Sequence, residues 1–449
     1  MQTTKLLLVY PAVRFENRLR YYMTDFSCAE APGAFVFPPL EMLYVASLAR
    51  ENNIAVRLID AASRRKPPEW TIQQCINETP THLLFPAPLG ELFFSVFDII
   101  NVLFQKIPGV KIAVFGPEVT MAPELALNYD SVDVVIIGEP DNACVNWVLG
   151  NKKADNLVFR DSSKTAELVP FNDLDALPHP ARDLINPRRY YAPFSRRGPY
   201  TTVWGSRGCV HGQCLFCSSS LWRPPKTYIH HSPEYIIEEF SQAGRLGYKE
   251  VFFRDQTFTG DYEWAETICI ELLKNKIKML WRCMTRVDCA DYELFKLMKR
   301  AGCYQISFGF ESPEQKVLDE NRKGIKIEDA FIAARDAKKA GLEVVGNFLI
   351  GLKGESRDAV FGIHDFARQL GCDFAQFHAV LPVPDKNKKS ICPPVNDTEK
   401  KVIKRAQRLA YLKFYLTPGF LVRRTFMLLD PRMLSATLKA AWNIVRYGM

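Results

Sequence analysis

Short apolar runs alternate with helical patterns along most of this chain of 449 residues, and this alternation restricts the fold more than any other feature. The runs are apolar throughout, which is typical of strands buried on both faces of a parallel sheet. Parallel strands need crossover helices, so the pattern predicts an α/β protein. Residues 1–150 contain five such runs: Lys5–Tyr10, Ala55–Asp60, His82–Phe85, Lys111–Phe115 and Asp133–Ile137. We expect a doubly wound parallel sheet there.

The loops after these five runs are the candidate ligand sites of the first domain, because doubly wound sheets bind ligands at the carboxyl ends of their strands. These loops are rich in glycine and proline. They include residues 11–37, Pro86–Gly90, Gly116–Thr120 and Gly138–Asp141. Glycine and proline are also ordinary turn residues, so both interpretations stay open for each of them.

A second series of apolar runs begins after a segment rich in Asp, Asn, Pro and Arg, which predicts a linker over residues 151–200. Six strand and helix units joined by right-handed crossovers close most of a barrel. We therefore expect a partial (β/α)6 barrel over residues 201–385 and a helical tail over residues 386–449. The six runs are Thr201–Trp204, Glu250–Arg254, Met279–Cys283, Tyr304–Phe308, Glu343–Leu349 and Phe374–His378.

Three cysteines, Cys209, Cys214 and Cys217, lie directly after the first barrel run. Disulfide pairing would leave one of them over, and three thiolates are too few for a tetrahedral structural zinc site. An iron–sulfur cube normally takes four cysteine ligands, so three would leave one iron open to a substrate or cofactor. The alternative is a zinc knuckle whose fourth ligand is one of the histidines His211, His230 and His231.

Polar residues and glycines also stand at the ends of the other five barrel runs. The active site of such a barrel is assembled at the carboxyl ends of its strands, so we expect these residues on one rim. Asp255 and Glu311 have a second interpretation as helix N-caps. The residues are Asp255, Arg286, Glu311, Asn347, Gly351, Glu355, Gln376 and His378.

Four segments, the cysteine loop, Arg254–Thr259, Ser307–Ser312 and Asn347–Glu355, are similar to those of the radical S-adenosylmethionine (SAM) enzymes. Over about residues 5–385 the chain resembles the group with an N-terminal cobalamin-binding-type domain. The resemblance implies a 4Fe-4S cluster on Cys209, Cys214 and Cys217, with SAM on the open iron. It also implies the cofactor-binding residues Asp255 near the methionine amine, Glu311 at the ribose and Gly346–Gly351 beside adenine, together with Arg286, Ser307, Asn347, Gln376 and His378.

The resemblance implies a radical enzyme. We expect it to generate a 5′-deoxyadenosyl radical and to transfer a methyl group from cobalamin to an unactivated carbon. The alternative is ring closure or carbon–carbon bond formation on a lipid-like or porphyrin-like substrate without methyl transfer. A third hypothesis is a metal-binding scaffold without catalysis. The expected partners are a small-molecule or lipid-like substrate and an electron donor such as a flavodoxin or ferredoxin.

The chain departs from the pattern of the group at three places. Four residues instead of three separate Cys209 from Cys214, which lengthens the loop without removing a ligand. The first domain lacks the Asp-x-His-x-x-Gly motif that supplies a histidine ligand to cobalt, and Leu84–Leu89 stands where relatives often have small hydroxyl residues near the corrin. Two alternatives therefore stay open: cobalamin bound without a protein ligand to cobalt, and no cobalamin at all. Leu381–Lys389 stands where relatives usually read Pro-Gly-Thr.

The net charge of +8 is concentrated in residues 401–449, where Asp430 is the single acid. An apolar stripe at helical spacing predicts that the tail either packs on the barrel or lies on an anionic membrane surface. Nucleic-acid binding is not expected, because the aromatic residues lie within apolar stripes. Twelve cysteines without a signal peptide or a membrane-length apolar run predict a cytoplasmic protein, with peripheral membrane contact through the tail. The stripe is Leu434, Leu438, Ala441, Trp442 and Val445.

Overall fold

The structure is a computed structural model that divides into two compact units, and each is described by itself. Unit 1 comprises Met1–Tyr190, Ser218–Pro225 and Val383–Ile391, and unit 2 comprises Tyr191–Cys217, Lys226–Pro382 and Cys392–Met449. The domain boundaries predicted from composition stay predictions. The described residues are 5–15, 18–22, 30–31, 36–90, 92–160, 167–190, 192, 195–219, 223–380, 397–418 and 420.

A six-stranded sheet with the order β5-β1-β6-β7-β8-β9 forms the centre of unit 1. Its first five strands in that order pair in parallel, as the apolar runs predict, and β9 pairs with β8 in the antiparallel direction. The doubly wound sheet is therefore confirmed, with an antiparallel edge strand added. The strands are β1 (Lys5–Tyr10), β5 (Ala55–Asp60), β6 (His82–Pro86), β7 (Lys111–Phe115), β8 (Val134–Ile136) and β9 (Leu157–Phe159).

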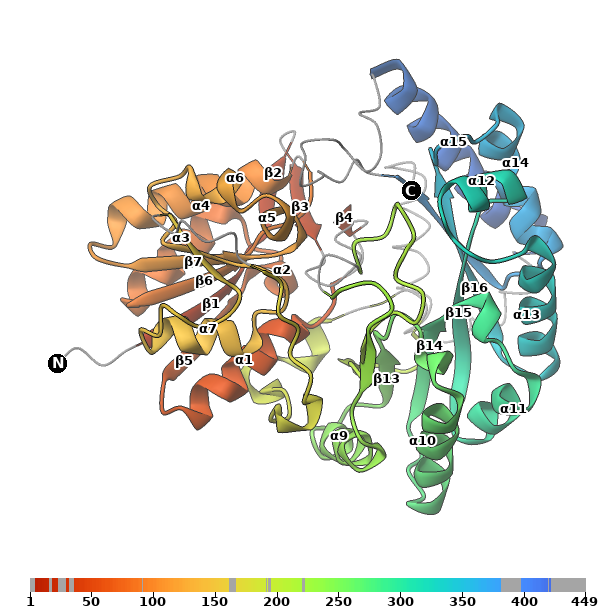
Figure 1. Cartoon of the computed structure of the whole chain (residues 1–449), viewed down its shortest axis with the longest axis horizontal. Coiled ribbons are helices and arrows are strands. Elements are labelled where there is room, and N and C mark those ends of the chain that lie inside the picture. Colours follow the sequence, from red (N-terminus) through yellow and green to blue (C-terminus); the bar gives the residue numbers. More distant parts are fainter. Residues whose placement is uncertain are drawn as a thin grey trace. The chain divides into compact units, whose positions relative to one another are not determined.

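Helices lie on both faces of this sheet, with α1 and α7 packed together on one face and α3 and α4 on the other (Figure 1). The helices are α1 (Leu40–Glu51), α2 (Ala61–Arg64), α3 (Pro68–Glu78), α4 (Leu92–Lys106), α5 (Pro117–Met121), α6 (Pro123–Leu127) and α7 (Asp141–Val148). Three short strands, β2 (Val13–Phe15), β3 (Arg18–Tyr22) and β4 (Glu30–Ala31), form a separate antiparallel sheet. Short 3-10 helices follow at Leu174–Ala176, Arg182–Leu184 and Pro187–Arg189.

Unit 2 contains the predicted partial barrel. Its six strands have the order β10-β13-β14-β15-β16-β17 and pair only in parallel. The fourth strand is longer than its apolar run, because it continues through Gly309 to Glu311. The strands are β10 (Tyr200–Val203), β13 (Glu250–Phe253), β14 (Leu280–Thr285), β15 (Cys303–Glu311), β16 (Glu343–Ile350) and β17 (Phe374–Ala379).

Helices cover the outer face of the barrel, as Figure 1 shows for α10, α11 and α13. Side-chain caps fix where four of them begin, since Ser232, Asp261, Asp291 and Ser356 each accept a hydrogen bond from a backbone N–H of the first turn. The helices are α9 (Pro233–Arg245), α10 (Tyr262–Lys274), α11 (Tyr292–Arg300), α12 (Gln315–Glu320), α13 (Ile327–Lys339) and α14 (Arg357–Gln369), with 3-10 helices at Phe258–Gly260 and Val287–Cys289.

Successive residues of the barrel strands point alternately to the helix-covered core and to the inside of the barrel. Phe308, Phe348 and Phe377 are buried in the core between the strands and the helices. Their sequence neighbours Ser307 and Asn347 are half-buried. Because successive side chains of a strand point to opposite faces, these polar neighbours face the inside of the barrel.

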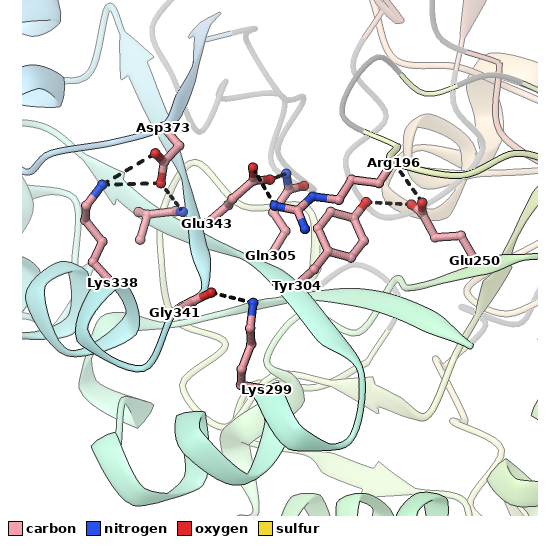
Figure 2. Close-up of polar contacts among 10 residues, drawn as sticks. Arg196, Glu250, Lys299, Tyr304, Gln305, Lys338, Gly341, Glu343 and Asp373 are labelled. Carbon is pink, nitrogen blue, oxygen red and sulfur yellow. Dashed lines mark hydrogen bonds and ion pairs between the residues drawn. The ribbon is translucent and has the colours of Figure 1, made fainter. Parts of the chain in front are cut away.

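Polar side chains fill the amino-terminal end of the barrel (Figure 2). Glu250, the first residue of β13, accepts hydrogen bonds from the Tyr304 hydroxyl at 2.7 Å and the Arg196 backbone N–H at 2.9 Å. Glu343, the first residue of β16, accepts from Arg196 Nη2 at 2.9 Å and Gln305 Nε2 at 3.2 Å. This network closes one end of the barrel, so its opposite end is the place for a site.

The helix α15 (Asp397–Tyr415) packs against β17, the last strand of the barrel sheet. Its residues Ala406, Ala410 and Phe414 belong to the barrel core. For this part of the tail the packing interpretation therefore holds. The apolar stripe from Leu434 to Val445 lies outside the described residues. Among the helices that the structure describes, none is both long and apolar enough to cross a membrane.

Candidate active site

The cysteine loop begins at the carboxyl end of the first barrel strand. A short hairpin of β11 (Ser206–Gly208) and β12 (Tyr228–His230) frames it, and Cys209 follows β11 directly. Cys209, Cys214 and Cys217 are partly exposed, and none of them forms a disulfide bond. Cys209 Sγ lies 3.6 Å from the hydroxyl of Thr257, which stands beyond the end of β13. The loop thus lies at the rim where the other strands also end.

The three thiols are a donor set that fits an iron–sulfur cluster, since cluster ligands are thiolates supplied from one loop. Among the ten described cysteines, only these three and Cys289 are partly exposed. In the described ranges no three His, Cys, Asp or Glu side chains are gathered as a finished metal site, so the ligand assignment stays a prediction. The zinc alternative gains no support from His211, whose Nε2 is 2.7 Å from the Arg322 carbonyl oxygen.

Two cations lie close to the cysteine loop. Burial raises the pKa of the Cys214 thiol to about 12, whereas the positive charges of Lys323 and Arg286 favour its thiolate. Arg286 is buried, and it donates from Nε and Nη2 to the Asp288 carboxylate at 2.9 and 2.8 Å. The sequence placed Arg286 at this rim, but it gave no indication of Lys323.

Asp255 is fully buried, and both of its carboxylate oxygens are hydrogen-bonded within the chain. It accepts from the Gly205 backbone N–H at 3.0 Å and from the Ser206 hydroxyl at 2.5 Å. Burial raises its pKa to about 7. Asp255 therefore braces the start of the hairpin that carries the cysteine loop, and its predicted contact with a methionine amine stays a prediction.

Gln256 is a residue that the sequence reasoning missed. Its amide Oε1 and Nε2 are both buried, and neither has a hydrogen-bond partner among the described residues. Buried polar atoms are nearly always paired, so such an amide needs an explanation. Gln256 precedes Thr257, whose hydroxyl is 3.6 Å from Cys209 Sγ, so its buried amide belongs to the candidate site. The only sequence signal was its place inside the Arg254–Thr259 segment.

The predicted residues of the last three strands share the inner face of the barrel. Gly309, Asn347 and Gln376 are in register across β15, β16 and β17. The Asn347 Nδ2 donates to the Phe308 carbonyl at 3.1 Å, and the Gln376 Oε1 is 3.2 Å from His378 Nε2. Burial lowers the pKa of His378, and the nearby negative charge of Glu311 opposes that shift.

Glu311 ends β15 in the left-handed region, with a φ of 62°, which is uncommon for a residue other than glycine. Its Oε1 is 2.6 Å from Lys323 Nζ, and both side chains are buried. The lysine thus contacts the carboxylate that we expected at the ribose. That ribose contact stays a prediction, with Lys323 as an unforeseen partner.

The two predicted glycines both have packing reasons in the structure. A Cβ at Gly346 would lie 2.5 Å from the Phe348 ring and 2.8 Å from Cys372 Sγ. Gly351 has a φ of +98°, and a Cβ there would lie 2.7 Å from Ile403 of α15. Their predicted position beside adenine stays a prediction.

In unit 1, the loops after β6, β7 and β8 contact one another at the carboxyl edge of the sheet. Thr120 Oγ1 donates to the Gly116 carbonyl at 2.7 Å and accepts from the Gly138 N–H at 2.9 Å. Glu118 accepts from the Gly90 N–H at 3.2 Å, and burial raises its pKa to about 7. These hydrogen bonds hold the three loops together at the edge where doubly wound sheets bind ligands.

One loop at this edge carries a buried ion pair. Arg223 donates from Nε and Nη2 to the two oxygens of Glu139 at 2.8 and 2.9 Å, with exposed side-chain fractions of 1% and 6%. Bidentate pairs of this kind combine strength with a fixed geometry. The pair holds the segment Ser218–Pro225 to unit 1.

Comparison with known proteins agrees with this geometry. Residues 205–367 match the model of the radical SAM superfamily. An uncharacterized methyltransferase of Pyrococcus horikoshii is 28% identical over 423 residues, which are 87% of this chain and 90% of that protein. The radical SAM methyltransferase TsrM of Kitasatospora setae, solved with cobalamin and a 4Fe-4S cluster, has a TM-score of 0.64 at 13% identity and covers 85% of this chain and 73% of its own.

A second solved structure with this fold is the cobalamin-dependent SAM radical enzyme OxsB, determined with aqua-cobalamin and SAM bound. Its TM-score is 0.65 at 18% identity, over 94% of this chain and 56% of that chain. The partial barrel with its cysteine loop is therefore a radical SAM domain. The protein thus carries a radical SAM domain, and its described fold is similar to the folds of TsrM and OxsB.

Proposed function

We propose that this protein is a cobalamin-dependent radical SAM methyltransferase that acts on an unactivated carbon of a small-molecule or lipid-like substrate. The observation that carries the proposal is the loop with three partly exposed cysteines, none in a disulfide bond, at the end of the first barrel strand. The methyltransferase name of the Pyrococcus horikoshii relative supports the choice of reaction.

Cys209, Cys214 and Cys217 would hold a 4Fe-4S cluster. Bound there with SAM, the cluster supplies the electron that cleaves SAM and so starts hydrogen-atom abstraction. The buried Gln256 amide offers a donor and an acceptor to SAM. The inward-facing Asn347 and Gln376 offer further amide contacts on the same rim. The polar network around Glu250 closes the other end of the barrel to solvent.

Cobalamin would bind at the carboxyl edge of the sheet in unit 1, where it would supply the methyl group. The support is the shared fold with TsrM and OxsB, both described with cobalamin bound, and the hydrogen-bonding loops around Thr120 and Glu118. A flavodoxin or ferredoxin is the electron donor that this chemistry needs. Peripheral membrane contact through the tail stays a prediction.

The products formed from SAM test the proposed reaction. The full chain is reconstituted anaerobically with iron, sulfide and hydroxocobalamin, reduced with dithionite and incubated with SAM, and the SAM products are measured by mass spectrometry. Methylation yields S-adenosylhomocysteine together with 5′-deoxyadenosine. Formation of 5′-deoxyadenosine alone would support the alternative, a ring closure or carbon–carbon bond formation without methyl transfer.

A further inference from the structure

The segment Asn321–Gly324 between α12 and α13 holds the cysteine loop through its backbone. The Asn321 carbonyl accepts the N–H of Leu215 at 3.1 Å, and the Arg322 carbonyl is 2.7 Å from His211 Nε2. A Cβ at Gly324 would lie 2.6 Å from the His211 ring, so a larger residue would push the loop away. Both contacts fall within the loop that runs from Cys209 to Cys217.

Lys323, in the middle of this segment, directs its side chain into the same region. Its Nζ lies 5.9 Å from the centre of the Phe216 ring, and Phe216 stands between Cys214 and Cys217. The lysine side chain is only 7% exposed, so water screens its charge weakly. A buried cation therefore lies near the Phe216 ring within the cysteine loop, and its charge acts on the Cys214 thiol.

Two neighbours fix Lys323 in this position. Glu311 Oε1 accepts from its Nζ at 2.6 Å. A Cβ at Gly309 would lie 2.9 Å from the Lys323 Nζ and 2.4 Å from the Glu311 Oε1, so the missing side chain of Gly309 makes the room that the pair occupies. Arg286 Nη2 donates to the Lys323 carbonyl at 3.0 Å and fixes its backbone.

We propose that the positive charge of Lys323 stabilises the reduced cluster. The segment Asn321–Gly324 keeps this lysine next to the cysteine loop. The inference rests on the proposed function, because it presumes a cluster on the three cysteines. Reduction adds one negative charge, which a cation in a weakly screened site stabilises. Hydrogen bonds, net charge and solvent exposure around a cluster set its potential.

The test is the reduction potential of the reconstituted full chain without SAM, followed by electron paramagnetic resonance. Lys323→Met should shift the potential to more negative values, because it removes a cation and leaves Glu311 unpaired. Glu311→Gln should shift it to more positive values, and the double variant should return toward wild type. Lys323→Arg should restore most of the effect. Lys316→Met, on the exposed face of α12, is the matched control and should leave the potential unchanged.

The outcomes separate this inference from the proposed function. A wild type that takes up no cluster overturns both. A normally loaded Lys323→Met variant with the wild-type potential overturns the inference alone. If Lys323→Met fails to take up iron, the reduction potential of Glu311→Gln becomes the deciding measurement. An unchanged potential in that variant would contradict the proposed role of the Lys323 and Glu311 pair. Hydrogen exchange of the Leu215 amide in the iron-free protein tests the hydrogen bond from this amide to the Asn321 carbonyl. The exchange should be slow in wild type. Fast exchange would show that Asn321 does not hold the cysteine loop.

Discussion

Asp255 and Gln256 are neighbours in the sequence, but their side chains are in opposite situations. The Asp255 carboxylate is hydrogen-bonded to Gly205 and Ser206, whereas the Gln256 amide is buried without a partner among the described residues. The sequence pointed to Asp255 as the contact of the methionine amine. The hydrogen bonds explain how Asp255 is accommodated inside the chain, and its contact with the methionine amine stays a prediction, whereas the Gln256 amide has no such partner among the described residues.

Replacement of Gln256 by alanine should weaken SAM binding without loss of iron. Removing one partner of a buried hydrogen bond costs about 1–3 kcal/mol, so the Kd should rise roughly 5- to 150-fold. Equilibrium dialysis with the reconstituted, unreduced protein measures this Kd. Gln73→Ala, on the exposed face of α3 in unit 1, is the control with an unchanged Kd. An unchanged Kd in Gln256→Ala would show that the amide does not contact SAM.

The raised pKa of Asp255 predicts a pH-dependent effect on stability. Burial raises this pKa from 3.8 to about 7, so between these values the folded chain binds more protons than the unfolded chain. The contribution of Asp255 to stability is therefore largest at low pH and falls as the pH rises through 7. Asp255→Asn, which cannot titrate, should cost more stability at pH 5 than at pH 8. Urea unfolding of both proteins measures the difference, and a cost independent of pH would contradict the shift.

Some site residues could be predicted from the sequence and others could not, for a physical reason. Asn347 and Gln376 follow from their place near the ends of barrel strands and Ser307 from the family resemblance, and strand periodicity accounts for their inward position in the structure. Lys323 has no such signal, since it lies in a polar loop and meets Glu311 only through the tertiary fold. Gln256 differs from any polar turn residue only by its burial, which a single sequence does not show.

At the scale of elements, α15 covers the free edge of the barrel sheet. The Tyr415 hydroxyl accepts from the Ala375 N–H at 3.0 Å and donates to its carbonyl at 2.8 Å. The Tyr411 hydroxyl accepts from the Phe377 N–H at 3.2 Å, and Gln407 donates to the Phe377 carbonyl at 2.7 Å. An uncovered edge strand is a site for unwanted pairing, so the helix satisfies β17 with side chains instead of another strand.

Removal of the two hydroxyls should loosen this edge. Tyr411→Phe and Tyr415→Phe each leave backbone groups of β17 without a partner, which costs about 1 kcal/mol per hydrogen bond. Hydrogen exchange at Ala375 and Phe377 should become faster in the double variant. Tyr292→Phe, on α11, serves as the control, because it removes a hydroxyl and keeps the aromatic ring that Lys339 faces. Unchanged exchange in the double variant would mean that α15 does not protect β17.

The strands themselves could be predicted because buried parallel strands are apolar along their whole length. β9 was missed, since its three residues Leu157–Phe159 are too few for a pattern. The extension of β15 to Glu311 was missed as well, because Gly309 and Glu311 are not typical strand residues. In the structure, Gly309 leaves room for the Glu311 and Lys323 pair, so tertiary packing overrides the local preference.

At the scale of the whole molecule, the chain combines a doubly wound unit with a partial barrel, and each has its candidate site at the carboxyl ends of its strands. This common position follows from the parallel arrangement, because all strands of a parallel sheet end at the same edge and the loops that follow them lie close together there. The described tail helix belongs to the barrel core. The remaining basic residues of the tail lie outside the described residues, and membrane contact through them stays a prediction.

The most direct test of the account is the iron content and SAM cleavage of the full chain with and without its three loop cysteines. Wild type reconstituted anaerobically should hold about four irons per chain and release 5′-deoxyadenosine when reduced with SAM. Cys289→Ala, which changes the other partly exposed cysteine of the described residues, should behave like wild type. The variant with Cys209, Cys214 and Cys217 all replaced by alanine should lose both the iron and the cleavage. Retention of the iron and of the brown absorbance by that variant would contradict the assignment of the active site.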